Sequence, residues 1–303
     1  MAEASSFLTK PRYAAVTGSN KGIGLEICRQ LASQGVVVVL TARNEFRGKE
    51  ALENLKKLGI PSDNLEFHQL DVTDPSSVAS LADFISAKFG KLDILVNNAG
   101  ILGAIADFDA LGAAGFGTPG SEADKFSEMM KLTYELAEDC IKTNYYGVKA
   151  TTEALSPLLQ LSDSPRIVNV SSSAGLLKYI RIERVRGILG NVDSLTEEKI
   201  DEVLNEFLRD CKEGSLETKG WRSFLPAYSV SKAALNAYTR ILAKRYPSII
   251  VNCLCPGYVK TDIIGNCGTF TVEEGGACCV RLALLPHGSP SGLFYRRNEI
   301  SSF

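Results

Sequence analysis

The chain has 303 residues, of which 45% are hydrophobic and 22% are charged, a composition typical of a soluble globular protein. Its formal net charge of −2 and pI near 5.9 argue against nucleic acid as a partner, because a nucleic-acid-binding protein shows a basic patch or stripe. No apolar run approaches the roughly 20 residues that cross a bilayer, so we expect no membrane partner.

The N-terminus and the cysteines predict where the protein works. The opening stretch MAEASSFLTKPRY contains no apolar core and no cleavage pattern of a secretory signal. The chain has eight cysteines, none in a CxxC pair, and two histidines, so we expect no metal site. Without a secretory signal the thiols should be reduced and mostly buried. We therefore expect a cytoplasmic protein.

The first hundred residues alternate strand-like and helix-like segments. Apolar, strand-length segments lie at 13–18, 36–42, 65–72 and 92–100. Between them, apolar residues recur at helical spacing in segments 21–35, 46–59 and 77–90. Strict alternation of this kind predicts βαβ units and a doubly wound parallel α/β sheet of the Rossmann type.

The same rhythm returns after two interruptions, within what we interpret as a single domain covering 1–303. The later elements are a long helix, a strand, a helix, a strand and a weak strand, at 137–160, 166–172, 228–246, 249–257 and 292–296. Residues 101–136 read as a loop with a short helix. Residues 176–225 form an insertion with a helix at 194–214, which Ser194 or Thr196 can cap.

A glycine-rich turn joins the first strand to the first helix. The stretch TGSNKGIG (17–24) places its glycines at 18, 22 and 24, a GxxxGxG spacing and not the general GxGxxG. Glycines let the backbone approach a pyrophosphate, and a helix N-terminus stabilises its negative charge. We interpret the turn as a dinucleotide site, the alternative being an ordinary tight turn.

The end of the second strand indicates which dinucleotide binds. NAD-binding proteins usually carry an acidic residue there for the ribose hydroxyl, but here the strand ends in Ala42 and Arg43. Arg43 can pair with a 2′-phosphate, and Lys21 offers a second cation. We predict NADP(H) as the cofactor, with Asp71 available to the adenine amine and the NNAG loop (97–100) at a ligand-binding strand end. The alternative is that both cations are solvated surface charges.

Tyr228 and Lys232, in the stretch AYSVSK, are four residues apart and so share one face of the predicted helix. A lysine charge beside a phenol should lower the tyrosine pKa and make it a usable proton donor or acceptor. The alternative is a surface pair without function. A serine run, Ser171 to Ser173, follows a strand and is by itself more typical of a turn.

Taken together, these motifs resemble the short-chain dehydrogenase/reductases. TGSNKGIG, NNAG, KTNYYG, VNVSSS, YSVSK and PGYVKT occur in the order found in that family, over about residues 12 to 300. The long segment before Tyr228, with phrases such as LTEEKIDEV and SKAALNAYTR, is similar to the plant menthone, neomenthol and isopiperitenone reductases and salutaridine reductase.

The resemblance implies roles for individual residues. Tyr228 would be the acid/base, Lys232 would lower its pKa and hold the nicotinamide ribose, Ser172 would bind the substrate carbonyl, and Asn144 would open the helix around a proton-relaying water. Side-chain alternation after the strand favours Ser172 over its two serine neighbours. The implied cofactor contacts are Gly18, Ser19, Asn20, Lys21, Gly22, Ile23, Gly24, Arg43, Asp71, Val72, Asn98, Ala99, Gly100, Tyr228, Lys232, Pro256, Gly257, Val259 and Thr261.

The insertion suggests how a substrate is enclosed. In the plant reductases that the chain resembles, a helical flap covers the site and occludes the usual dimer face, which implies a monomer. Apolar or aromatic residues near the ends of the insertion and after the PG turn would join Ser172 and Tyr228 as substrate contacts: Leu176, Leu177, Trp221, Phe224 and Tyr258. The alternative for each is ordinary packing of the flap onto the body.

These observations predict an NADPH-dependent carbonyl reductase that interconverts a ketone and a secondary alcohol on a small apolar, terpenoid-like or alkaloid-like substrate. An ene reductase acting on an enone is one alternative. The presence of Tyr228 favours carbonyl chemistry, because isopiperitenone reductase, which reduces a C=C bond, lacks this tyrosine. A non-catalytic NADP-binding protein is the other alternative. Residues 101–135 are shorter than the matching loop of the menthone-type enzymes, so the specific substrate is not transferred.

Overall fold

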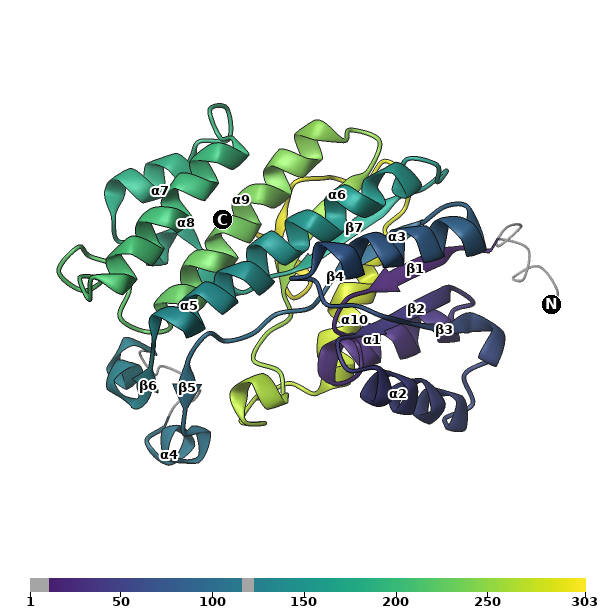
Figure 1. Cartoon of the computed structure of the whole chain (residues 1–303), viewed down its shortest axis with the longest axis horizontal. Coiled ribbons are helices and arrows are strands. Elements are labelled where there is room, and N and C mark those ends of the chain that lie inside the picture. The colour runs from purple at the N-terminus through teal and green to yellow at the C-terminus, as the bar shows by residue number, and fades with distance from the viewer. Residues whose placement is uncertain (1–10, 116–122) are drawn as a thin grey trace.

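A mostly parallel sheet organises the chain, of which the computed structural model describes residues 11–115 and 123–303 (Figure 1). Within that part, eight strands pair in the order β10-β9-β8-β7-β4-β1-β2-β3. Their bounds are β1 Tyr13–Val16, β2 Val37–Ala42, β3 Leu65–Gln69, β4 Ile94–Asn97, β7 Arg166–Val170, β8 Ile250–Cys255, β9 Phe294–Arg296 and β10 Glu299–Ser301. The predicted doubly wound sheet is confirmed, and each predicted strand is present but shorter.

Helices cover both faces of this sheet. On one face lie α1 (Gly22–Ser33), α2 (Glu45–Lys57) and α10 (Val272–Ala283), and on the other lie α3 (Pro75–Phe89), α6 (Gly147–Leu159) and α9 (Pro226–Arg245) (Figure 1). The central strands are therefore sealed from water, and Ala14, Ala15 and Val16 of β1 have no exposed surface. A strand covered on both faces reads as a continuous apolar run, which is why the sequence revealed it.

The sequence did not reveal α10, although its start carries a capping box between Thr271 and Glu274. Two consecutive glycines, Gly275 and Gly276, obscured the helical pattern. Packing requires both of them, because a Cβ on Gly275 would lie 2.8 Å from Val259 and one on Gly276 would lie 2.7 Å from Glu26. The glycines let α10 lie against α1 and against the segment after β8.

The predicted long helix over 137–160 is confirmed, with one irregularity inside it. It consists of α5 (Tyr134–Ile141), a π-helical turn over Lys142–Tyr146, and then α6. A π turn carries an extra residue that breaks the regular hydrogen-bond ladder, and such turns occur frequently at functional sites. Asn144 lies in this turn.

The insertion between β7 and α9 is helical, as predicted. It contains α7 (Glu183–Gly190) and α8 (Glu197–Lys212), and the side chain of Thr196 caps α8. Buried apolar residues of α8, among them Ile200 and Phe207, join the core that α5 and α9 share. Figure 1 shows α7 and α8 beside α5 and α9, at one end of the sheet.

The remaining elements are short. Residues 101–133 hold α4 (Phe108–Ala113) and a two-stranded ribbon of β5 (Ile105–Ala106) and β6 (Met130–Lys131); part of this predicted loop, 116–122, and residues 1–10 lie outside the described chain. Turns of 3-10 helix occur at Ser62–Asn64, Ala123–Met129, Ser173–Gly175, Leu177–Tyr179 and Asp262–Ile264. All eight cysteines are free thiols. In the described ranges no helix is long and apolar enough to cross a membrane, and no cluster of metal-binding side chains occurs.

Candidate active site

The glycine turn has the geometry that a pyrophosphate requires. Gly18 and Gly22 have φ of +61° and +56°, in the left-handed region that favours glycine. A Cβ on Gly24 would lie 2.7 Å from the carbonyl oxygen of Gly18, so the turn closes tightly onto the start of α1. The first turn of α1 holds no acidic residue. Its N-terminal N–H groups therefore offer a positive end that no carboxylate of the helix's own first turn opposes.

The NNAG loop holds this turn in place. The side-chain amide of Asn98 donates to the carbonyl oxygens of Thr17 (2.9 Å) and Gly18 (3.0 Å). In return, the hydroxyl of Thr17 accepts from the backbone N–H groups of Asn98 and Ala99, both at 2.9 Å. The sequence suggested a ligand contact for Asn98. The structure shows that its amide group fixes the glycine turn.

The two predicted cations differ in their surroundings. Arg43 is exposed at the end of β2, and the nearest acidic residue along the chain, Glu45, is paired with Lys49 at 2.6 Å. Lys21 instead forms an ion pair with Asp262 at 2.8 Å. Both partners of that pair are 62% exposed, so it contributes little and a phosphate can displace it. Arg43 is thus more available than Lys21 to bind a phosphate group.

Other predicted cofactor residues gather at the same edge of the sheet. Thr261 lies against the glycine turn, since a Cβ on Gly22 would be 3.4 Å from its methyl group. Gly257, with φ of +98°, makes the sharp turn after β8. One oxygen of Asp71 accepts from the N–H (2.9 Å) and the hydroxyl (2.7 Å) of Thr73. The Asp71 carboxylate therefore already has a structural role at the end of β3.

Asn144 is held at the centre of the π turn by reciprocal hydrogen bonds. Its side-chain oxygen accepts from the N–H of Ile101 (2.8 Å), and its amide donates to the carbonyl of Ile101 (2.9 Å). The same amide reaches Ser231 Oγ at 3.1 Å and Cys140 Sγ at 3.3 Å. These contacts attach the loop after β4 to α5 and α9. The sequence offered no sign of the two supporting residues, Cys140 and Ser231.

Gly100 brings the catalytic candidates together. A Cβ on Gly100 would lie 3.2 Å from Asn144 Oδ1 and 3.4 Å from Lys232 Nζ. Lys232 is 4% exposed, its ammonium donates to the carbonyl of Val170 (2.9 Å), and it lies 5.6 Å from the centre of the Tyr228 ring. Three segments distant in sequence, the NNAG loop, the π turn and α9, thus converge beside the end of β7.

The expectation that Tyr228 has a lowered pKa is wrong. Burial raises the pKa of Tyr228 well above its ordinary value, and a hydrogen bond with Ser172 opposes this only in part. Burial also lowers the pKa of Lys232 to about 8. In both groups desolvation disfavours the charged form. Tyr228 is therefore a neutral phenol near neutral pH, which makes it a proton donor.

Side-chain alternation along the strand is not what distinguishes Ser172 from Ser171 and Ser173. Strand β7 ends at Val170, so side-chain alternation no longer applies at the serines. Ser171 Oγ donates to Asn236 of α9 at 2.6 Å, which leaves it engaged in the core. Ser172 is hydrogen-bonded with Tyr228, and its hydroxyl caps the following 3-10 turn. Ser172 is thus the serine that stands beside the tyrosine.

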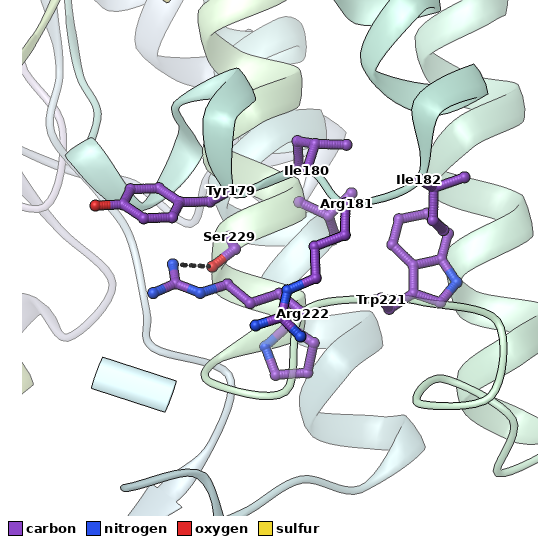
Figure 2. Close-up of a pocket in the computed structure, with 9 residues that line it drawn as sticks. Tyr179, Ile180, Arg181, Ile182, Trp221, Arg222 and Ser229 are labelled. Atoms are coloured by element: carbon purple, nitrogen blue, oxygen red, sulfur yellow. Dashed lines mark hydrogen bonds between the residues drawn. The ribbon is translucent and has the colours of Figure 1, made fainter. Parts of the chain in front are cut away.

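Several predicted substrate walls belong to the packed interior instead. Trp221 stacks edge-on against Phe207 with ring centres 5.1 Å apart, and its Nε1–H donates to Asp210 at 2.8 Å. Trp221 lines a crevice of only about 10 Å³, room for about one water molecule. Figure 2 shows Trp221 among the residues of this crevice, where Arg222 donates to Ser229. Leu176 is 5% exposed and packs with Cys253 and Phe294.

Phe224 is buried as well, whereas Tyr258 lies beside Ser172. Phe224 belongs to an apolar cluster with Leu111 and Phe126, against which Tyr228 packs. Tyr258 lines a cavity of about 900 Å³ beside Ser172. The C-terminal residues 296–301 also line that cavity. The sequence did not predict this part of the lining, because a strand pattern close to the chain end gives no sign of what it faces.

Comparisons with known proteins agree with this geometry. The family pattern described as short chain dehydrogenase matches residues 12–183 and 214–270. The unmatched stretch between them coincides with α7 and α8, which supports their interpretation as an insertion.

Individual relatives match almost the whole chain. It is 67% identical over 303 residues to short-chain dehydrogenase/reductase 1 of Saponaria officinalis, covering 100% of both chains. It is 58% identical to (+)-neomenthol dehydrogenase of Arabidopsis thaliana, covering 97% of this chain and 98% of that protein. The solved structure of salutaridine reductase from Papaver somniferum is 55% identical, with a TM-score of 0.87 over 94% of this chain and 99% of that chain.

Proposed function

The chain belongs to the short-chain dehydrogenase family, and on that premise we propose that it is an NADP(H)-dependent carbonyl reductase, which interconverts a ketone and a secondary alcohol. The observation that carries the proposal is the convergence of Ser172, Tyr228 and Lys232 beside a cavity of about 900 Å³. The names of the relatives, neomenthol dehydrogenase and salutaridine reductase, support a cyclic terpenoid-like or alkaloid-like substrate.

The residues divide the work of reducing a carbonyl. A bound nicotinamide cofactor supplies the hydride that the carbonyl carbon receives. The developing negative charge on the oxygen is stabilised by donors aimed at it, for which Ser172 and Tyr228 are placed. Tyr228 then gives its phenolic proton to that oxygen, and Lys232 favours the resulting phenolate. Asn144 joins the π turn to the loop after β4 by two hydrogen bonds with Ile101, and so keeps both segments beside Lys232.

NADP(H) is proposed over NAD(H) because of the end of β2. The glycine turn and the free positive end of α1 fit a pyrophosphate. An exposed arginine at the site of the usual ribose-binding acid favours a 2′-phosphate, which accepts two parallel hydrogen bonds from a guanidinium. Lys21 can add to this contact when its exposed pair with Asp262 opens.

We further propose that the protein is a monomer. Helix α8 packs against both α5 and α9, so these helices do not present an open face to a second copy. Buried Glu197, at the start of α8, connects this helix to α6 and α9 through ion pairs with Lys149 (2.7 Å) and Arg245. Light scattering coupled to size-exclusion chromatography tests this, and a dimer mass would contradict it.

The test of the function is NADPH oxidation with a panel of cyclic ketones, with the products identified by gas chromatography. Consumption that yields a secondary alcohol supports the carbonyl reductase, whereas a saturated ketone formed from an enone would show an ene reductase. The control is Tyr228→Phe, which removes the proton and should lower turnover by about 10²- to 10⁴-fold with NADPH affinity kept. A variant that retains most of its rate would refute the role of Tyr228.

A further inference from the structure

Two groups of residues line the cavity beside Ser172. One is Ser172, Gly257 and Tyr258, and the other is the C-terminal segment 296–301. The cavity volume of about 900 Å³ is at the upper end of ligand pockets, which hold drug-sized molecules. A bound cofactor shares this space, because Gly257 is also a predicted cofactor contact. The remaining lining leads from Ser172 and Tyr258 to the C-terminal segment, where a substrate longer than one small ring can reach.

The C-terminal segment is a hairpin fixed in one position. Strands β9 and β10 are joined by a turn in which Arg297 has φ of +54°, an uncommon conformation for a residue other than glycine. Arg297 N–H donates to the carbonyl of Cys255 (2.8 Å), and its guanidinium lies 3.6 Å from the Phe270 ring centre. Arg281 of α10 holds the other turn residue, Asn298, by two hydrogen bonds of 3.1 and 3.2 Å. These contacts hold the strained turn in place.

The register of the hairpin places Arg296 on the face of the sheet that α9 covers. Arg296 lies opposite Cys255 of β8, and the neighbouring pair Cys253 and Phe294 lies on the face that packs toward the flap and α9. Residues paired in register share a face of the sheet, so Arg296 projects on the Tyr228 side of β8. Within residues 11–115 and 123–303, its exposed guanidinium has no hydrogen-bond or ion-pair partner. The other arginine of the turn, Arg297, is already occupied by Glu274.

We propose that Arg296 determines substrate specificity by donating a hydrogen bond to a neutral oxygen, a hydroxyl, ether or carbonyl, at the end of the substrate remote from the reacting ketone. This inference rests on the proposed carbonyl reductase function and makes the substrate longer and more polar than a small apolar ketone. A neutral group is favoured over an anion, because Glu299 lies directly opposite Arg296 in the hairpin and also lines the cavity. The carboxylate of Glu299 repels an anion and can accept from a substrate hydroxyl.

The experiment compares three tricyclic ketones of one skeleton that carry, on the ring farthest from the ketone, a methyl, a hydroxyl or a carboxylate group. The full-length enzyme should prefer the hydroxyl ketone. Arg296→Ala should lower kcat/KM for that ketone about tenfold through KM, the magnitude of one hydrogen bond to a charged donor. The methyl ketone should lose less than about twofold, because it has no acceptor for Arg296. Glu299→Gln should improve the carboxylate ketone selectively.

Two further variants make the result decisive. Arg296→Gln keeps a donor and should retain part of the preference, whereas Arg209→Ala, an exposed arginine on α8, should change nothing. Equal losses for the methyl and hydroxyl ketones, or a wild-type preference for the methyl ketone, would overturn the inference while the carbonyl reductase stands. Wild-type turnover of none of these ketones nor of the small cyclic ketones would overturn both.

Discussion

The titration of Lys232 should control the direction of the reaction over an accessible pH range. Its ammonium is buried, donates to the carbonyl of Val170 at 2.9 Å and lies beneath the Tyr228 ring. Burial lowers its pKa to about 8, whereas Tyr228 remains a neutral phenol throughout that range. Ketone reduction needs the ammonium, because it stabilises the phenolate that forms when Tyr228 gives up its proton.

The magnitude follows from the position of that pKa. About 90% of Lys232 is charged at about pH 7 and about 10% at about pH 9, one unit either side of the value. The rate constant of ketone reduction should therefore fall about tenfold between these two pH values. Alcohol oxidation needs a proton acceptor and should rise over the same interval.

The assay measures initial rates of NADPH oxidation, and of NADP reduction with the alcohol, under saturating cofactor. Lys232→Arg provides the control, because a guanidinium stays protonated at every pH used. Its residual reduction rate should not vary between about pH 7 and about pH 9. A wild-type profile that is level in both directions, or an arginine variant with the same inflection, would refute the role given to Lys232.

Three other predictions test the supports of the site. Asp210→Ala should lower the free energy of unfolding by about 2–4 kcal/mol, because it leaves the buried N–H of Trp221 unpaired; denaturant titration measures this, and a loss below about 1 kcal/mol would contradict it. Burial raises the pKa of Asp210, but its hydrogen bonds to Lys219 and Trp221 outweigh burial and lower the pKa overall. The stability that the Asp210 carboxylate contributes should therefore be fully present above its unfolded pKa of about 4. This stability should be lost as the pH falls through the lower pKa of the folded state. Arg43→Ala should weaken NADPH binding by about tenfold or more and leave NADH binding unchanged, as measured by fluorescence titration; equal losses would refute the 2′-phosphate contact. Ser231→Ala should lower kcat by about fivefold with KM and melting temperature nearly kept, because Asn144 loses an acceptor at 3.1 Å; an unchanged kcat would show that Ser231 does not position Asn144.

Helices and strands could be predicted from the sequence wherever their own residues, and not distant partners, determine their structure. The β1 and β2 segments are almost entirely apolar because helices cover both of their faces, and the helix at Tyr228 shows its i,i+4 pair directly. The cap of α8 by Thr196 was also among the predictions. These features are local, so residue order alone contains them.

Features that depend on a distant partner were missed or misjudged. The π turn at Asn144 could not be seen, because the hydrogen-bond partner of Asn144, Ile101, lies 43 positions away. Helix α10 was hidden by glycines that only its contacts with α1 and with Val259 explain. Trp221 looked like a pocket wall until Asp210 and Phe207 were placed around it.

The sequence by itself determined the parallel α/β architecture, the glycine turn, the tyrosine–lysine pair and the expectation of a phosphate-binding arginine. Each depends on the spacing or chemistry of neighbouring residues. Only the tertiary structure decided the ionisation of Tyr228 and Lys232, since desolvation depends on what surrounds a group in space. It alone also brought the C-terminal hairpin, more than 120 positions beyond Ser172, to the cavity beside that serine. The polarity of that cavity depends on side chains from several elements, so it cannot be read from any single stretch of the sequence.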